Sequence, residues 1–261
     1  MSAPDAYRPD QFALSGAWNF RDVGGMRTVD GSRTRSGVLY RSSALTHLTD
    51  TGRADLTGFG VQHVFDLRSA AELERDGSDR TPDSVSVHGV PYALPAADAV
   101  DPVRAAENAP HERQDRATSA REYMSESYRG FPTLPGARIA IASVIGTIAS
   151  SGSSVLVHCA AGKDRAGWTV ATVLRAAGVA EDDIVADYLR SNDAIEPLRR
   201  HILDHIDDAV DLDDDLLGVH EEYYRGGLES MYSTYGSFDN YLDWIGIDSD
   251  TVAGLRRALI V

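Results

Sequence analysis

The chain has 261 residues, of which 43% are hydrophobic and 25% are charged, and its formal net charge is −15 at pH 7. This size and composition are typical of a globular protein with a full hydrophobic core, and the acidic balance argues against nucleic acid or an anionic membrane surface as the main partner. A single cysteine excludes an intramolecular disulfide and a cysteine-only zinc site.

The amino terminus, MSAPDAYRPD, lacks the basic and apolar regions of a secretory signal, and no run approaches the ~18 apolar residues of a membrane span. We therefore expect no integral membrane segment, and either a cytoplasmic location or export without a recognisable signal. The chain shows no internal repeat and no linker, so we expect one α/β domain over residues 1–261, with residues 1–12 as a loose tail.

The first half of the chain predicts short strands separated by turns and helices. Asp30-Gly31 lies between two strand-capable runs, which predicts a β-hairpin at about 26–35. Apolar runs bounded by turn residues predict strands at residues 38–40, 61–67 and 85–92. A segment that begins with polar residues predicts a helix at residues 45–58. Residues 93–117 are rich in alanine, proline and charge, which predicts an irregular excursion with short helical pieces.

Polar residues follow the predicted strands at their carboxyl ends, where α/β sheets usually have their binding and catalytic sites. Arg41 either forms a wall of an anion pocket or pairs with an acidic neighbour at the surface, and Arg21 and Arg68 could add to the same basic pocket. Asp66 either caps the turn after its strand or orients Arg165 or Asp164 in a neighbouring loop. Ser69 and Glu72 form a capping box, so we interpret Glu72 as a helix cap rather than a catalytic acid.

The second half predicts helices packed around one buried strand. Apolar residues at 141, 144, 145 and 148 predict an amphipathic helix beside the apolar strand Val155–His158. Helical spacing then resumes until Gly178, and further helices are expected at about 181–190 and 249–259.

Residues 158–168, HCAAGKDRAGW, lie between this strand and the next helix. Unpaired N–H groups and the positive end of a helix dipole converge at such a position, which therefore binds anions. Cys159, the only cysteine, lies there beside Lys163 and Arg165. Thiols in such surroundings titrate at roughly 3.5–7.5, so a reactive thiolate is predicted.

The other residue types of the loop suit the transfer of a phosphoryl group. The planar fork of Arg165 can bind two phosphoryl oxygens, and Gly162 lets the backbone turn and aim its amides inward. Asp164 could protonate the departing oxygen.

The spacing Cys-x5-Arg between a strand and a helix resembles the signature loop of the protein-tyrosine phosphatase superfamily. HCAAGKDR, with NFRDVGG, YRSS and DLRSAAE upstream, is similar to a bacterial subgroup of the mycobacterial phosphatase B type, which acts on phosphotyrosine and often on phosphoinositides. The resemblance covers roughly residues 15–195. It implies a mostly parallel sheet flanked by helices, a phosphoprotein or phosphoinositide substrate, and a cysteinyl-phosphate mechanism without metal or cofactor.

The resemblance also implies roles for single residues. Cys159 would be the nucleophile and Arg165 the phosphate ligand, while Asp164 would serve as an acid or as a loop organiser. The remaining loop residues would bind substrate, and these are Ala160, Ala161, Gly162, Lys163 and Ala166. Their backbone amides would contact the phosphoryl group, and the Lys163 side chain would contact an additional phosphate of the substrate. His158 is expected to be structural and to hydrogen-bond the loop.

Two features keep alternatives open. The family usually has Thr or Ser where this chain has Ala166, so a catalytically weak module that only binds phosphate remains a second hypothesis. Residues 196–235 crowd aspartates and tyrosines, which fits either a solvated helix pair or a lid over the site. The sequence leaves open the natural phosphoester, the oligomeric state, and whether Asp164 or Asp66 is the general acid.

Overall fold

The computed structural model describes residues 13–92, 113–204 and 213–261. The centre of this described part is a five-stranded sheet with the order β1-β2-β5-β3-β4. Its strands are β1 (Arg21–Asp22), β2 (Leu39–Ser42), β3 (His63–Asp66), β4 (Ser86–Gly89) and β5 (Val155–His158). All neighbouring pairs are parallel except β1 with β2, so the mostly parallel sheet expected from the sequence is confirmed.

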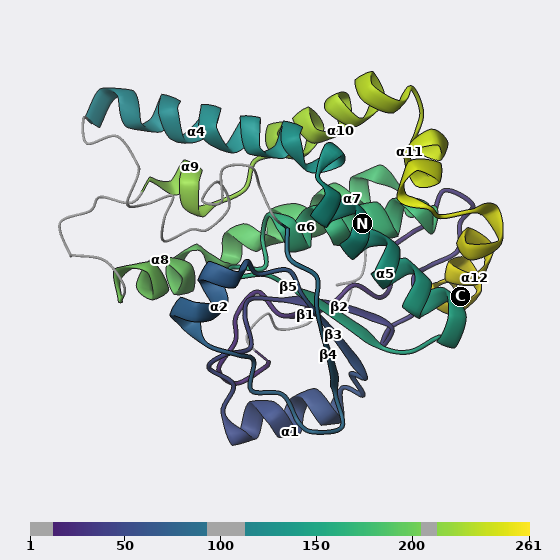
Figure 1. Cartoon of the computed structure of the whole chain (residues 1–261), viewed down its shortest axis with the longest axis horizontal. Coiled ribbons are helices and arrows are strands. Elements are labelled where there is room, and N and C mark those ends of the chain that lie inside the picture. The colour runs from purple at the N-terminus through teal and green to yellow at the C-terminus, as the bar shows by residue number, and fades with distance from the viewer. Residues whose placement is uncertain (1–12, 93–112, 205–212) are drawn as a thin grey trace, which may run out of the picture.

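The central strand β5 is buried on both faces, which explains its uninterrupted apolar run. Val155 and Val157 belong to the larger hydrophobic core, together with helices α5 (Pro135–Ser151) and α6 (Arg165–Ala176). Leu156 points to the other face and joins a smaller core that includes Leu56 of helix α1 (Asp50–Gly58). Figure 1 shows α1 on the opposite side of the sheet from α5 and α6.

The parallel strands bring three loops together at one edge of the sheet. Ser42 at the end of β2 and Asp66 at the end of β3 both lie in register with His158 at the end of β5. The loops that follow these strands therefore start as neighbours, although they are more than 90 residues apart along the chain in the case of β3 and β5. This edge is where the sequence placed its candidate site.

Helix α1 begins later than predicted. The expected helix covered residues 45–58, whereas α1 starts at Asp50, because the Thr49 side chain accepts a hydrogen bond from Gly52 N and caps the helix there. Leu45 and Leu48 precede the helix and still fill the smaller core. The spacing of these two leucines in a buried loop matches that of a helix, so the predicted helix began too early.

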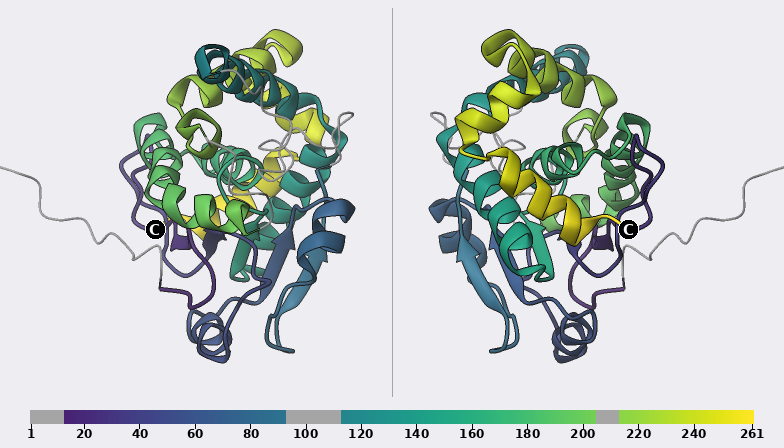
Figure 2. Two further views of the ribbon diagram at one scale, coloured as in Figure 1. Left: turned by 90° about the vertical axis from the view of Figure 1, so that its left-hand side faces the viewer. Right: turned by 90° about the vertical axis from the view of Figure 1, so that its right-hand side faces the viewer.

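Helix α4 (Arg113–Gly130) corrects the prediction of irregular structure over residues 113–117. The rest of that predicted excursion, residues 93–112, lies outside the described residues. The buried side of the helix includes Ala120, Met124 and Tyr128, a narrow i, i+4, i+8 stripe in an otherwise polar sequence. This stripe packs against helix α10 (Glu221–Tyr235), and Figure 2 shows the two helices side by side above the sheet.

The other helices complete the fold. They are α2 (Ala70–Asp76), α7 (Glu181–Leu189), α8 (Ile195–Leu203), α9 (Asp214–Leu217), α11 (Phe238–Ile245) and α12 (Ser249–Leu259), with short 3-10 turns at Phe131–Thr133 and Arg190–Ala194. Of these, α2, α7 and α12 were predicted, the first from its capping box, and α12 packs along α5. The predicted hairpin at 26–35 is present as antiparallel backbone bonds, among them Thr34 N to Met26 O at 2.8 Å.

No single helix in the described part of the chain is long and apolar enough to cross a membrane. One pair, Ala120–Thr133 and Pro135–Ser151, has the necessary length and composition only when it is joined across a bend of 62°.

Candidate active site

The residues from Cys159 to Asp164 form the turn from β5 into α6, and every residue from His158 to Ala166 is buried. Gly162 adopts a φ of +72°, and a Cβ there would lie 2.2 Å from the carbonyl oxygen of Ser42. The turn thus packs directly on the end of β2, and only glycine fits at this point.

The carbonyl oxygens from Cys159 to Lys163 all lie within hydrogen-bonding distance of groups outside the loop backbone. These groups are Nδ1 of His158 for Cys159 (3.2 Å), N of Ala44 for Ala160 (2.9 Å), Nδ2 of Asn19 for Ala161 (3.1 Å), and the Arg41 guanidinium for Gly162 (2.7 Å) and Lys163 (3.2 Å). Five consecutive peptide groups are therefore fixed in orientation.

This arrangement prepares the opposite side of the loop for an anion. Within the described residues, the backbone N–H groups from Ala160 to Asp164 have no acceptor. Because the C=O and N–H of one peptide group point in opposite directions, outward carbonyls turn the following N–H groups inward. Inward N–H groups at a helix amino terminus are a phosphate-binding arrangement.

Arg165, the first residue of α6, is held by Glu72 of α2. Its Nη1 and Nη2 donate to the two carboxylate oxygens of Glu72 at 2.6 and 2.5 Å, and Nη1 also lies 3.3 Å from Leu67 O. Burial raises the pKa of the Glu72 carboxyl, but the charge and hydrogen bonds of Arg165 outweigh it and lower the pKa to about 2. The guanidinium plane is thus fixed beside the loop by a bidentate ion pair.

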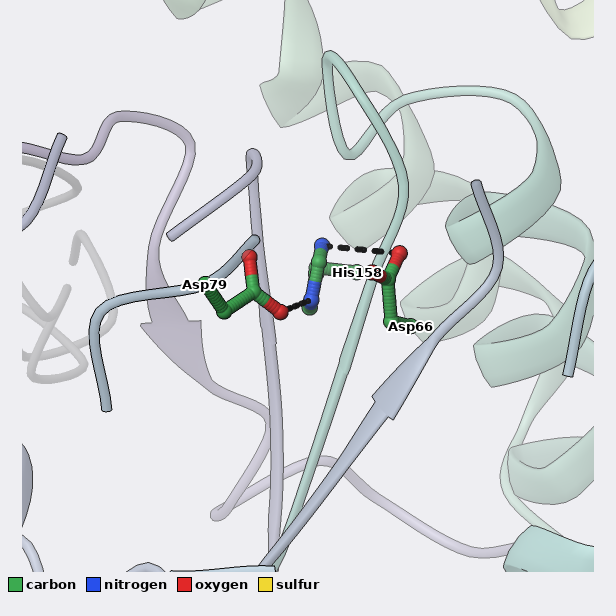
Figure 3. Close-up of side chains that lie close together, drawn as sticks. All are labelled: Asp66, Asp79 and His158. Atoms are coloured by element: carbon green, nitrogen blue, oxygen red, sulfur yellow. Dashed lines mark hydrogen bonds and ion pairs between the residues drawn. The ribbon is translucent and has the colours of Figure 1, made fainter. Parts of the chain in front are cut away.

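His158 belongs to a buried cluster of charged side chains (Figure 3). Its Nε2 lies 2.7 Å from Asp79, and its Nδ1 lies 3.8 Å from Asp66. Within the described residues these three side chains are the group with the spacing of metal ligands. Arg68, however, binds Asp66 at 2.8 Å and Asp79 at 2.9 Å, so a guanidinium already supplies the positive charge that a metal ion would bring.

The side chains of Asp164 and Lys163 point to the helices above the sheet. Asp164 Oδ1 accepts a hydrogen bond from the buried Tyr128 hydroxyl at 2.9 Å, and its Oδ2 lies 3.3 Å from Lys163 Nζ. The Lys163 ammonium also donates to Leu216 O at 2.7 Å and to Gly218 O at 3.1 Å, at the carboxyl end of α9. Only 4% of the Lys163 side chain is exposed, so this conformation covers it.

Taken together, the site offers one buried thiol, a row of inward N–H groups, a fixed guanidinium and a carboxyl group within one turn. This set suits in-line displacement at phosphorus by sulfur. Independent comparisons agree with the geometry: the sequence profile described as "Tyrosine phosphatase family" matches residues 12–261. The chain belongs to this family.

Relatives support the same assignment. The chain is 40% identical over 280 residues to the triple specificity protein phosphatase PtpB of Mycobacterium tuberculosis, and the match covers 95% of this chain and 98% of that protein. It is 34% identical to a protein of Cupriavidus necator whose name also includes tyrosine-protein phosphatase, over 91% of this chain and 84% of the relative. A tyrosine-protein phosphatase of Nostoc commune is 28% identical over 85% of this chain and 74% of that protein. The resemblance stated from the motifs is confirmed, and the protein is a phosphatase.

Three arginines expected near the phosphate of this phosphatase lie elsewhere. Arg21 and Arg41 are buried against the same carboxylate, Asp187, at 2.6 and 2.8 Å, and Arg68 is bound by Asp66 and Asp79. Arg41 thus pairs with an acidic side chain, as one of its two predicted roles required, but it is buried and not at the surface. It supports the loop from behind, where its positive charge needs a buried acidic partner.

Asp66 follows one of its two predicted roles. Its carboxylate accepts hydrogen bonds from the backbone N and the side chain of Arg68, so it caps the turn after β3, and the other predicted role, orienting Arg165 or Asp164, is not the one observed. Glu72 takes the place that was predicted for Asp66. The capping box that we read from the sequence is present, and the same carboxylate serves both the cap and Arg165, so the interpretation as a cap alone was incomplete.

Several supporting residues were not singled out from the sequence. Asn19 lies in the NFRDVGG motif and adopts a φ of +55°, which Asn tolerates better than most residues, so the motif carried a signal that could have been used. Asp79, Tyr128 and Asp187 lie outside any motif and are single polar residues in ordinary surroundings. Ala166 is fully buried in the first turn of α6, within the larger core.

Proposed function

We propose that this phosphatase removes the phosphoryl group from phosphotyrosine in proteins through a covalent cysteinyl-phosphate on Cys159. The observation that carries the proposal is the position of a buried thiol at the start of a loop whose N–H groups are left to bind an anion. The name of the M. tuberculosis relative speaks of triple specificity, which supports more than one substrate class. Phosphoserine, phosphothreonine and phosphoinositides are the further substrates that we propose.

The first step transfers the phosphoryl group to sulfur. The Cys159 thiolate attacks phosphorus in line, the P–S bond forms, and the bond from phosphorus to the leaving oxygen breaks. Water then attacks phosphorus, the P–S bond breaks, and inorganic phosphate leaves with the thiolate restored. In both steps Arg165 and the N–H groups from Ala160 to Arg165 hold the three equatorial oxygens, which lowers the barrier by fixed electrostatic stabilisation.

Asp164 is the proposed proton carrier. Protonated, it donates its proton to the leaving oxygen, and as a carboxylate it then accepts a proton from the attacking water. Tyr128 and Lys163 contact its two oxygens, so the side chain keeps one orientation in both its protonated and its ionised form. Asp66, the other carboxyl considered, is occupied by Arg68 and is the weaker choice.

Lys163 is the proposed ligand of a second phosphate on substrates that carry more than one. Its ammonium is bound to Leu216 O and Gly218 O, so it becomes available only when the residues around α9 move away. Because Leu216 and Gly218 make these contacts, residues 213–220 are the part of the predicted lid that we propose to move.

Turnover of p-nitrophenyl phosphate tests the function. The wild type should hydrolyse it, while Cys159→Ser should lose turnover and keep its affinity for inorganic phosphate, because the N–H groups and Arg165 remain. Turnover of Cys159→Ser within tenfold of the wild type would refute the thiolate mechanism. A wild type that binds phosphate without turnover would instead favour the phosphate-binding module suggested by Ala166.

The substrate class needs a second assay. Initial rates on a panel of phosphotyrosine, phosphoserine and phosphothreonine peptides and on phosphoinositides in mixed micelles should show the highest kcat/KM on phosphotyrosine, with measurable rates on the others. Activity confined to phosphoinositides would overturn the protein substrate while leaving the mechanism intact.

A further inference from the structure

The imidazole of His158 lies between two groups that can only accept hydrogen bonds. Nε2 is 2.7 Å from Oδ2 of Asp79, and Nδ1 is 3.2 Å from the carbonyl oxygen of Cys159. A carbonyl oxygen and an ionised carboxylate are acceptors, and a neutral imidazole carries one N–H. Both bonds can therefore form together only when the ring is the doubly protonated imidazolium.

Asp79 is placed to remain ionised beside this ring. Its Oδ1 accepts hydrogen bonds from Leu45 N at 3.1 Å and from the Arg68 guanidinium at 2.9 Å. Burial raises the pKa of the Asp79 carboxyl, but the charges and hydrogen bonds of His158 and Arg68 outweigh it and leave the pKa below its ordinary value. The carboxylate thus does not take the proton back from the ring.

The charges that face His158 balance only when the ring is positive. Asp79 approaches from the segment after α2, and Asp66 from the end of β3 at 3.8 Å, while Arg68 binds both carboxylates. Two negative groups and one guanidinium leave one negative charge, which the imidazolium neutralises. Burial lowers the pKa of His158, but Asp79 and Asp66 outweigh it and raise the pKa above its ordinary value.

We propose that Asp79 is a positioning residue for the nucleophile and that it acts by locking His158 as an imidazolium next to Cys159. This inference rests on the proposed role of Cys159. The positive ring stabilises the neighbouring thiolate. In addition, the Nδ1–H bond polarises the peptide group between Cys159 and Ala160, whose N–H is one of those proposed to bind the phosphoryl oxygens.

The first test measures alkylation of Cys159 by iodoacetamide as a function of pH, which reports the thiolate without any turnover. Asp79→Asn should react about tenfold more slowly than the wild type at pH 6 and equally fast at pH 9, as expected when a neighbouring unit charge is lost in a protein interior. Asp66→Asn is the matched control, because it removes the same charge from the cluster and keeps the Nε2 bond. Its reaction at pH 6 should slow by less than threefold. Equal slowing in both variants, or slowing at every pH, would overturn the proposal.

A second test asks whether Asp79 acts through the ring. In a His158→Asn background, the further change Asp79→Asn should leave the alkylation rate unchanged at pH 6. Another tenfold decrease in that background would show that Asp79 acts by a different route and would contradict the inference.

A third test uses the wild type alone and so does not depend on the folding of a variant. The ¹⁵N NMR signals of the His158 ring at pH 7 should show two protonated nitrogens, and a singly protonated ring would overturn the proposal. Neither alkylation nor NMR requires turnover. If the wild type had no phosphatase activity, the proposed function would be refuted, while the alkylation and NMR results would still decide whether Asp79 holds His158 as an imidazolium.

Discussion

Glu72 serves two functions with one carboxylate. It caps α2 by accepting a hydrogen bond from Ser69 N, and it holds the Arg165 guanidinium with both oxygens. The side chains of both Glu72 and Arg165 are almost wholly buried, so loss of the negative charge would leave an unbalanced buried cation.

We predict that Glu72→Gln lowers kcat/KM on p-nitrophenyl phosphate by roughly 10²-fold, the loss expected when a catalytic group shifts by about 1 Å. Glutamine keeps the size and one acceptor oxygen, so the cap is largely retained. The matched control is Glu74→Gln on the same helix, an exposed position that should leave the kinetics unchanged. Unchanged kinetics in Glu72→Gln would mean that the loop alone orients Arg165.

Asp164 accepts a hydrogen bond from the Tyr128 hydroxyl at 2.9 Å, which makes Tyr128 a second position at which the role of Asp164 can be tested. Asp164→Asn should slow hydrolysis of alkyl phosphates by about 10²–10⁴-fold, and that of activated aryl phosphates far less, since only poor leaving groups need a proton. Tyr128→Phe should also slow alkyl phosphates, by about tenfold, because it removes the hydrogen bond that orients the Asp164 carboxyl group.

The control for Tyr128→Phe is Tyr40→Phe, a buried tyrosine in the smaller core whose hydroxyl donates to Phe59 O. It should leave the ratio of alkyl to aryl rates unchanged. If Asp164→Asn slows both substrates equally, Asp164 organises the loop and does not carry the proton.

At the scale of elements, polar contacts attach the α9 segment to the site, and Leu216, Leu217 and Val219 of this segment also belong to the larger hydrophobic core. Lys163 binds the carbonyls of Leu216 and Gly218, and Asn192 clamps Val219 by accepting from its N–H at 2.7 Å and donating to its carbonyl at 3.0 Å. These contacts add to the apolar packing of the segment, so the loss of any one of them should lower the free-energy cost of its local opening.

We predict that Lys163→Ala has two separable effects. Limited proteolysis within residues 213–220 should become faster, because two hydrogen bonds from a buried ammonium are lost. Activity should fall more on phosphoinositides than on a phosphotyrosine peptide, because the proposed ligand of the second phosphate is lost. Asn192→Ala should reproduce the faster proteolysis but not the change in substrate preference. If Asn192→Ala changed the substrate preference as Lys163→Ala does, opening of the segment and not the lysine side chain would govern that preference.

Elements were predicted well where the signals are local. The strand Val155–His158, the loop after it and helix α6 were readable because a short apolar run, a glycine and a helical period follow one another directly. The start of α1 and the length of α4 were not, because a buried loop contains leucines and α4 gains its stability from packing on α10. Such tertiary partners have no counterpart in a local window of sequence.

At the scale of the whole molecule, the site is assembled from loops that follow different strands. The upstream motifs could be recognised, yet their functions could not be derived, because Arg41 reaches the carbonyls of Gly162 and Lys163 only after β2 and β5 pair. The proposed nucleophile Cys159 and the proposed phosphate ligand Arg165 could be named from the sequence without such information. The contacts of Asp79 with His158 and of Tyr128 with Asp164 could not be predicted, because the sequence around a single polar residue does not indicate its tertiary partner.

Asp187 lies at a point where three distant parts of the chain meet, since it binds Arg21 of β1 and Arg41 of β2 from helix α7. Burial raises the pKa of its carboxyl, but the two arginines outweigh burial and lower the pKa to about 2 from the ordinary value of 3.8. A carboxyl whose pKa is lower in the folded state adds stability that is fully present above about pH 4. That stability is lost as the pH falls through about 2.

We therefore predict that the free energy of unfolding in urea decreases between about pH 4 and pH 2, and that Asp187→Asn makes this decrease smaller. At pH 7 the variant should be less stable by about 3–5 kcal/mol, because two buried guanidinium groups lose their shared partner. Asp183→Asn is the control: its partner Arg27 is 61% exposed, so the loss should stay within about 1 kcal/mol. Equal losses in the two variants, or an acid dependence that Asp187→Asn leaves unchanged, would show that the shared carboxylate does not join these elements energetically.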